Sequence, residues 1–325
     1  PPPRRRLQAT AIPEQWMTIR DAKSPTARRV SFDDASEGSH IQSIVLGPDG
    51  KVYGSMTTGP LNDDWQQFQG VIEASQSDDQ ARLTVTTSGQ GKLYLDMVSL
   101  FPQKTFKGRK NGLRPDLVQA LVDLNPKFLR FPGGCIAHGC SLQNAYRWKD
   151  TVGDVAQRRA NWNRWGYHQT YGLGYYEYFL LCEDLGAAPL PVVPVGVSCG
   201  YNKPYQVAPL DELREWIDDA LDLVEFANGP VDGEWGKVRA DMGHPEPFGL
   251  EYICLGNEEH DTPEVRERIP YFVKAIRQAH PEIKLIGTSG LGHNVPLYRL
   301  MKELKVHSSD EHYYSKPEWY IENQD

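Results

Sequence analysis

Glu251-Tyr252-Ile253-Cys254-Leu255-Gly256-Asn257-Glu258 is the stretch that decides the fold of this chain. The apolar run from Tyr252 to Leu255 is too short for a helix and rich in strand formers, which predicts a strand buried on both faces. Glu258 follows its carboxyl end, the edge at which parallel α/β proteins carry reacting groups. Gly and Asn are also ordinary turn formers, so Gly256-Asn257-Glu258 taken alone is better explained as a plain turn than as a site.

The residues around this strand repeat the same order of elements. From Phe101-Pro102 onward, apolar runs alternate with segments that carry apolar residues at helical spacing. A strand-then-helix order with short links predicts a parallel sheet covered by helices, and a (β/α) barrel fits it best. The predicted helices are at about 113–122, 172–185, 210–226, 264–279 and 296–304, and the predicted strands at 127–131, 190–195, 252–255, 283–286 and up to His312.

The number of repeats is smaller than a closed barrel requires. Such a barrel has about eight strand-helix units, whereas only five or six are found between Lys127 and Asp325. We therefore expect an α/β fold in which residues 101–325 form an incomplete, truncated (β/α)8 TIM barrel. We also expect its first strand to lie upstream of Pro1, so that both ends of the barrel are missing.

The chain before the barrel has a different character. Residues 1–28 are rich in Pro and Arg without any period, which predicts a linker or disordered terminus. Residues 29–100 contain short alternating runs separated by Gly- and Asp-rich turns, which predicts an all-β sandwich of the carbohydrate-binding-like type. Trp65 and Tyr94 are candidates for a sugar platform there, although aromatic residues of a small sandwich are more often core.

Composition and motifs exclude several classes of function. A formal charge of -8 and a pI near 5.6 argue against nucleic acid as a partner. No apolar stretch approaches the roughly 18 residues that would span a membrane. No convincing phosphate loop or serine-centred elbow is found, which leaves hydrolysis by carboxylates. No metal site is predicted, because the five cysteines do not have the spacing of metal ligands. The same holds for the four candidate histidines, which are His138, His244, His260 and His280.

Polar side chains collect where the predicted strands end. Arg130 leads into Pro132-Gly133-Gly134, whose glycines would let the backbone turn tightly and approach a ligand. Arg130 could bind hydroxyls or a carboxylate, or pair with an inner acidic residue. We expect the polar groups of the last strand to share a ligand with Glu258. These groups are Asp310, His312 and Tyr314.

A dense group of aromatic residues lies between positions 146 and 178. Aromatic faces suit the C–H faces of sugar rings, and their hydroxyls and indole N–H groups bond at the ring edges. Core packing of a long loop is the alternative, and we expect about half of the group to be structural. Its members include Tyr146, Trp148, Trp162, Trp165, Tyr167 and Tyr171.

Six short motifs are spread along the barrel region. They are Arg130–Cys135, Tyr146–Gly153, Gly172–Tyr178, Gly243–Phe248, Gly256–Glu258 and Asp310–Tyr314. Together they resemble glycoside hydrolase family 51, the α-L-arabinofuranosidases, and the likeness extends from about Leu93 to Trp319. The β-rich part before it looks like the carbohydrate-binding-like insert of some members.

The resemblance implies a retaining glycosidase on a (β/α)8 barrel that uses no cofactor. Glu258 would be the general acid/base, and Asn257 would bond the 2-hydroxyl of the sugar. The family's nucleophilic glutamate lies at the end of the seventh strand, beyond Asp325, and its substrate-binding glutamate near the first strand has no match here. The furanose subsite would be lined by Arg130, Cys135, Trp148, Asn257, His312 and Tyr314.

The resemblance also implies arabinose-containing carbohydrates, such as arabinan or arabinoxylan, as partners, and a homo-oligomer. We expect an extracellular or cell-envelope protein, with the cytoplasm as the alternative. Two other functions remain open. One is a non-catalytic sugar-binding fragment that lacks its nucleophile, and the other is a retaining barrel glycosidase that acts on xylosides or glucans.

Overall fold

The computed structural model describes residues 25–33, 40–62, 64–88, 92–201, 204–292 and 294–323. Its contacts divide the chain into two compact units, Pro1–Asp123 and Leu124–Asp325, which are described separately. The predicted linker lies outside the described residues up to position 24, and its last four residues, 25–28, belong to the first strand. The domain boundaries proposed from the sequence remain predictions.

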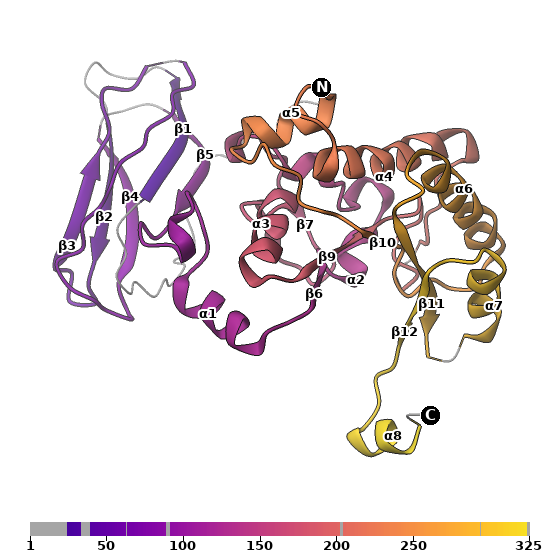
Figure 1. Cartoon of the computed structure of the whole chain (residues 1–325). Coiled ribbons are helices and arrows are strands. Elements are labelled where there is room, and N and C mark those ends of the chain that lie inside the picture. Colours follow the sequence, from indigo (N-terminus) through magenta and orange to yellow (C-terminus); the bar gives the residue numbers. More distant parts are fainter. Residues whose placement is uncertain are drawn as a thin grey trace. The chain divides into compact units, whose positions relative to one another are not determined.

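The first unit is β-rich and contains two small antiparallel sheets (Figure 1). Strand β1 (Pro25–Asp33) pairs with β5 (Lys92–Leu100), and β2 (His40–Leu46) lies between β3 (Val52–Thr57) and β4 (Arg82–Ser88). Ile41 and Val45 of β2 are buried while their neighbours are only half-buried, which is the period of two expected for a strand. Ile41 packs against Leu93 and Leu95 of β5, so the two sheets share apolar contacts.

The two aromatic residues proposed as a sugar platform both lie in this unit. Trp65 is exposed and Tyr94 is half-buried. Their role in sugar binding stays a prediction. Helix α1 (Pro115–Leu124) contains the boundary between the two units, and the sequence predicts this helix at about 113–122.

The second unit contains a five-stranded sheet in which every neighbouring pair is parallel (Figure 1). Each strand pairs with the next one of the sheet along the chain, which is the strand order of a (β/α) barrel. This sheet with its helices is an incomplete (β/α)8 barrel, as the sequence predicts. In order, the strands are β6 (Phe128–Phe131), β9 (Ala188–Val193), β10 (Tyr252–Leu255), β11 (Lys284–Leu291) and β12 (Ser308–His312).

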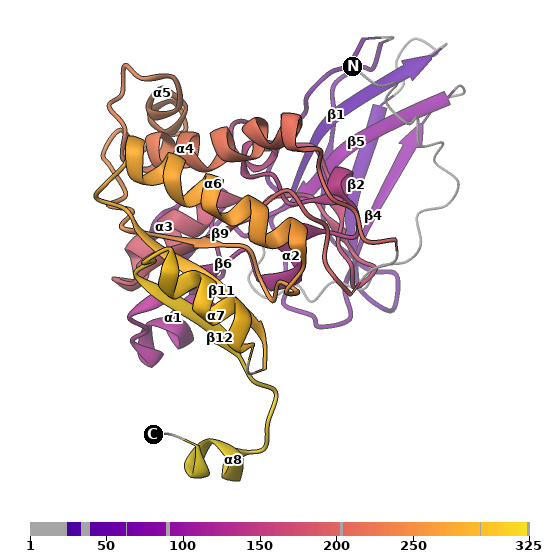
Figure 2. The same cartoon turned by 90° about the vertical axis from the view of Figure 1, so that its right-hand side faces the viewer.

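Helices connect these strands and pack on the sheet (Figure 2). Parallel strands need such crossovers because each strand must return to the same end of the sheet. Apolar residues of the four crossover helices α3, α4, α6 and α7 join β9 and β10 in one large core. The helices are α3 (Tyr175–Leu185), α4 (Leu213–Asn228), α5 (Glu234–Asp241), α6 (Pro263–Ala279), α7 (Val295–Glu303) and the terminal α8 (Pro317–Glu322).

Strand β10 is buried on both faces, as its apolar run predicts. Ile253 and Leu255 belong to the core shared with the helices. Cys254 points to the other face, where it packs with Val192 of β9 and Ala137. Because all three side chains are at most 2% exposed, the strand has no freedom to shift by one residue, and the position of the following turn is fixed.

Three parts of this unit are not predicted from the sequence. Two are helix α5, which carries no strong apolar stripe, and the terminal helix α8. The third is the long connection between β6 and α3, which contains helix α2 (Gly134–His138), three short 3-10 turns and the small hairpin of β7 (Asn161–Trp162) and β8 (His168–Gln169).

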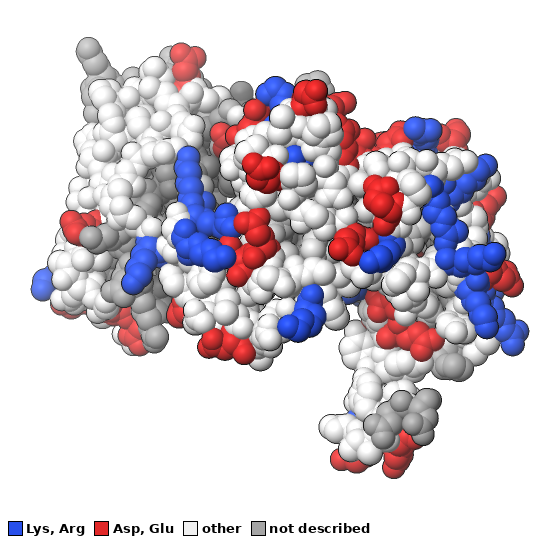
Figure 3. All heavy atoms as spheres, viewed as in Figure 1, with Lys and Arg blue, Asp and Glu red and all other residues white. Residues whose placement is uncertain are grey.

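The surface carries charges of both signs. On the face drawn in Figure 3, Lys and Arg side chains are interrupted by Asp and Glu groups. Among the residues that the structure describes, no helix is long and apolar enough to cross a membrane.

Candidate active site

The carboxyl ends of the parallel strands bring most of the predicted site residues together. Arg130 comes from β6, Glu258 follows β10, and His312 ends β12. Residues that are far apart in the sequence can meet here because parallel strands all end at the same edge. The side-chain contacts show which of them do.

Glu258 is the centre of the group. Its Oε1 atom accepts a hydrogen bond from the hydroxyl of Tyr314 at 3.1 Å and lies 2.8 Å from Nδ1 of His312. Glu258 is only 9% exposed, whereas Tyr314 is 84% exposed. The contact with the carboxylate raises the pKa of Tyr314, which keeps that phenol a hydrogen-bond donor. One oxygen of Glu258 is therefore held by two side chains of the last strand and its extension.

The backbone of the turn after β10 is unusual. Gly256 has φ +73° and Glu258 has φ +51°, so both lie in the left-handed region. A Cβ atom on Gly256 would lie 2.5 Å from Oε1 of Glu259, which explains why glycine is needed there. Glu258 has a side chain and must adopt the same region at a cost of about 1 kcal/mol, which is the kind of local strain often found at functional sites.

A chain of charged groups runs from Glu258 to Arg130. Nε2 of His312 lies 3.0 Å from Asp310 Oδ2, and the same oxygen lies 3.0 Å from Arg130. The hydrogen bond with Asp310, helped by the one with Glu258, raises the pKa of His312. Burial works against ionisation of Asp310, but His312 and Arg130 outweigh it and lower the pKa of that carboxyl. As an imidazolium, His312 donates one N–H to each acid, so the two carboxylates are linked by a single ring.

Asn257 is fixed from two sides. Its side-chain oxygen accepts a hydrogen bond from Arg130 at 2.8 Å. On the other side lies Gly134, where a Cβ atom would approach the amide atoms of Asn257 to 2.6 Å. The amide passes this close to the backbone only because position 134 has no side chain, and this accounts for the second of the two glycines after β6.

Cys135 also reaches this group, and it has a second cysteine beside it. Its sulfur lies 3.9 Å from Glu258 Oε2 and 4.0 Å from the amide nitrogen of Asn257. A hydrogen bond from Cys135, with the guanidinium of Arg164 also close, lowers the pKa of Cys199 to about 6. The same contact, together with burial, raises the pKa of Cys135. Cys199 is therefore the thiolate of the pair near neutral pH.

Trp148 does not join the other predicted residues. It is 2% exposed, and its indole N–H donates to the backbone oxygen of Asp219 in α4 at 2.7 Å. It packs edge-on against Trp235 of α5. These contacts place Trp148 in the core, and its expected role in the furanose subsite stays a prediction. Tyr146 and Tyr171 are buried as well, whereas the exposed members of the aromatic group are Trp162, Trp165 and Tyr167.

Two buried residues beneath the turn are missing from the sequence-based site. His138 and Glu259 form a pair with 2.8 Å between Nε2 and Oε1, and their side chains are 1% and 3% exposed. Nε2 of His138 also lies 3.1 Å from the backbone nitrogen of Asn257. The sequence signals are weak, since Glu259 merely follows Glu258 and His138 ends the short helix after two glycines.

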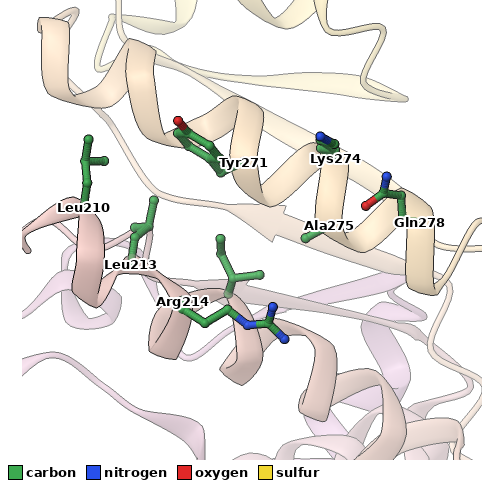
Figure 4. Close-up of a pocket in the computed structure, with 8 residues that line it drawn as sticks. Leu210, Leu213, Arg214, Tyr271, Lys274, Ala275 and Gln278 are labelled. Atoms are coloured by element: carbon green, nitrogen blue, oxygen red, sulfur yellow. The ribbon is translucent and has the colours of Figure 1, made fainter.

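No metal centre is formed by the described residues, where no three His, Cys, Asp or Glu side chains are arranged to hold an ion. A pocket of about 350 Å³ lies between α4 and α6 (Figure 4). Its lining includes Leu213, Tyr271 and Lys274 but no residue of the group around Glu258. It is formed by the helical layer and not by the strand ends.

Comparisons with known proteins agree with this geometry. Residues 120–325 match the family model described as alpha-L-arabinofuranosidase 1 domain. An extracellular exo-alpha-L-arabinofuranosidase of Streptomyces chartreusis is 44% identical over 277 residues, which is 80% of this chain and 33% of the relative. Alpha-L-arabinofuranosidase 2 of Arabidopsis thaliana is 42% identical over 223 residues, 68% of this chain and 32% of its own length.

Among solved structures, the arabinose-bound MgGH51 α-L-arabinofuranosidase superimposes with a TM-score of 0.78 at 30% identity. The match covers 93% of this chain and 48% of that one. This chain therefore spans about a third of the length of the curated relatives and about half of the solved structure. The family model and the solved structure together show that the chain belongs to the α-L-arabinofuranosidases of glycoside hydrolase family 51.

Proposed function

We propose that the protein removes terminal α-L-arabinofuranosyl groups from arabinose-containing oligosaccharides or polysaccharides with retention of configuration. The observation that supports this most strongly is the carboxyl group of Glu258, which is enclosed at the end of β10 and oriented by His312 and Tyr314. The named activity of the relatives agrees with it.

Glu258 is proposed as the general acid/base. In the first step its protonated carboxyl gives a proton to the glycosidic oxygen while a second carboxylate attacks the anomeric carbon. In the second step the Glu258 carboxylate takes a proton from water, which attacks the same carbon and releases the sugar. Asn257 is proposed to bond the 2-hydroxyl, and Arg130 fixes the orientation of its amide. The remaining predicted contacts come from Cys135, His312 and Tyr314.

Asp310 is a poor candidate for the second carboxylate. Its oxygen is already held by both Arg130 and His312, and these cations stabilise its charge. Stabilisation of its negative charge by two cations makes a carboxylate a weaker nucleophile. The nucleophile is proposed to lie outside the segment 1–325, as the family resemblance implies.

The test uses the intact protein that contains this chain. The Glu258→Ala variant is expected to lose about 10²–10⁴-fold in kcat/KM on an arabinoxylo-oligosaccharide, the usual range for an acid/base group. It should lose much less on 2,4-dinitrophenyl α-L-arabinofuranoside, whose leaving group needs no proton. Azide should restore turnover and yield an arabinosyl azide of the substrate's configuration, as read by NMR.

Glu311→Ala is the matched control. Glu311 is also a glutamate near the last strand end, but it is exposed and contacts Tyr313. Its replacement by alanine should leave kcat/KM for both substrates unchanged. If Glu258→Ala retains wild-type rates, or if xylosides or glucans are cleaved faster than arabinofuranosides, the proposal is wrong. Binding of arabinose without any turnover by the wild type would favour the sugar-binding alternative.

Two further proposals concern location and assembly. We infer that the protein works outside the cell, because the Streptomyces chartreusis relative is named an extracellular enzyme. Activity in washed cells and in the culture medium, compared with that in a lysate, tests this. The homo-oligomer implied by the resemblance is tested by sedimentation of the intact protein.

A further inference from the structure

We propose that the buried pair of His138 and Glu259 positions the turn that carries Asn257 and Glu258, and so sets the direction of the acid/base carboxyl. This inference rests on the proposed function of Glu258. Their side chains are only 1% and 3% exposed, so both would act through their neighbours.

His138 connects three successive strand ends. The residue ends helix α2, which follows β6. Its Nδ1 atom donates to the backbone oxygen of Val197 at 3.1 Å, in the connection after β9. Its Nε2 atom lies 2.8 Å from Glu259 and 3.1 Å from the backbone nitrogen of Asn257, both in the connection after β10. A single imidazole thus ties together the loops that follow β6, β9 and β10.

Glu259 also contacts a fourth strand, β11. Its backbone N–H lies 3.5 Å from the Thr288 hydroxyl of β11. A Cβ atom on Gly290 of the same strand would approach the backbone oxygen of Glu259 to 2.8 Å, which shows how closely β11 packs against the residue. Movement of Glu259 is therefore opposed by β11 as well as by His138.

The proton positions explain how the pair holds Asn257. A backbone carbonyl only accepts, so Nδ1 of His138 carries a proton. Burial disfavours the charged ring, but the carboxylate of Glu259 outweighs it and raises the pKa of His138. The backbone N–H of Asn257 donates to Nε2 of His138 at 3.1 Å and to Oε1 of Glu259 at 3.4 Å, while Nε2 and that oxygen lie 2.8 Å apart. Whichever of the two atoms carries the shared proton, the other remains an acceptor for the N–H of Asn257.

The turn has a physical need for such a support. Glu258 adopts φ +51°, a conformation that a residue with a side chain leaves when nothing holds it. The backbone N–H of Asn257, the residue directly before Glu258, is held by the buried pair. A buried ion pair contributes little net stability compared with apolar residues of similar size. The pair is therefore better explained by the geometry that it fixes than by the stability that it supplies.

The inference predicts a specific kinetic signature. In His138→Ala, kcat/KM for an arabinoxylo-oligosaccharide should fall about 100-fold, as expected for a displacement of about 1 Å in a catalytic group. The loss on 2,4-dinitrophenyl α-L-arabinofuranoside should be smaller by a factor of about ten or more, because that substrate needs no acid. His138→Gln, which keeps an N–H toward Glu259, should recover part of the activity. A purely structural defect would lower kcat/KM for both substrates by the same factor.

The matched control is a second His–Glu pair of the same unit. His244 and Glu183 are 2.7 Å apart but lie away from the strand ends, with Glu183 about half exposed. His244→Ala should leave the ratio of the two kcat/KM values unchanged. In a Glu258→Ala background, His138→Ala should lower the remaining kcat/KM values of the two substrates by the same factor, because only the acid/base group distinguishes between them.

Two results would overturn the inference. One is an unchanged ratio of the two kcat/KM values in His138→Ala, whatever happens to its melting temperature. The other is a change in that ratio when His138→Ala is added to Glu258→Ala. If His138→Ala does not fold, the ratio is read in His138→Gln and Glu259→Gln instead. A wild type that is inert toward arabinofuranosides, or a fully active Glu258→Ala, would instead refute the proposed function, so the two failures are distinguishable.

Discussion

Replacing Gly134 by alanine should damage the site through one added methyl group. The Cβ atom would lie 2.6 Å from the amide nitrogen and oxygen of Asn257, whereas ordinary contacts begin near 3.4 Å. Relief of this clash requires the amide to move by about 1 Å, a shift that commonly costs catalysis about 100-fold. The movement also breaks the 2.8 Å hydrogen bond from Arg130 to Asn257.

The size of the effect follows from that hydrogen bond. A bond to a charged donor contributes about 1.5–3 kcal/mol, so its loss corresponds to about 10- to 100-fold in kcat/KM. Stability should change little, because alanine is the better helix former by up to about 1 kcal/mol and Gly134 begins helix α2. In Gly134→Ala, kcat/KM should therefore fall while the melting temperature stays close to that of the wild type.

The assay is kcat/KM for 4-nitrophenyl α-L-arabinofuranoside, measured with the intact protein beside its melting temperature. Gly59→Ala is the control, because the nearest atom to its added Cβ is Phe68 Cε1 at 4.0 Å. That variant should match the wild type. A Gly134→Ala variant with kcat/KM within twofold of wild type would show that the contact between Gly134 and Asn257 does not control the site.

Three further predictions follow from the charged groups. Asp310→Asn should lower the pKa of His312, as measured by NMR titration. The same variant should lose more melting temperature at pH 5 than at pH 9, because a raised histidine pKa stabilises the fold only while the ring is protonated. The thiolate absorbance at 240 nm should appear with a midpoint of about 6, should vanish in Cys199→Ser, and should shift to higher pH in Arg164→Gln. Arg239 is fully buried and donates to four backbone oxygens, so Arg239→Met should lower the free energy of unfolding by about 3–5 kcal/mol, with little rescue by Arg239→Lys.

The sequence predicts much of the barrel because central strands of its sheet are short apolar runs. The run at 252–255 corresponds to β10, since a strand enclosed on both faces has little choice of residue. The strand predicted at 127–131 corresponds to β6, although Phe128 is exposed there. The meeting of Arg130, Glu258 and His312 was also predictable, because parallel strands end at one edge. Such reasoning needs only the order of the elements.

The parts that the sequence does not predict depend on contacts between loops. Nothing in the spacing of His138 and Glu259, which are far apart in the chain, indicates that they meet beneath Asn257. The aromatic group shows the same limit, because a tryptophan suits a sugar face and a protein core equally well. Trp148 packs in the core, and only its surroundings in α4 and α5 reveal this.

Because the backbone of Glu258 is left-handed, selection for stability and selection for the proposed activity favour different residues at this position. A glycine at that position would relieve about 1 kcal/mol of conformational strain. A screen for heat resistance alone would therefore tend to accept the very replacement that deletes the proposed acid/base group. Engineering efforts that aim at durability in this protein should hold position 258 constant and look for gains elsewhere in the chain.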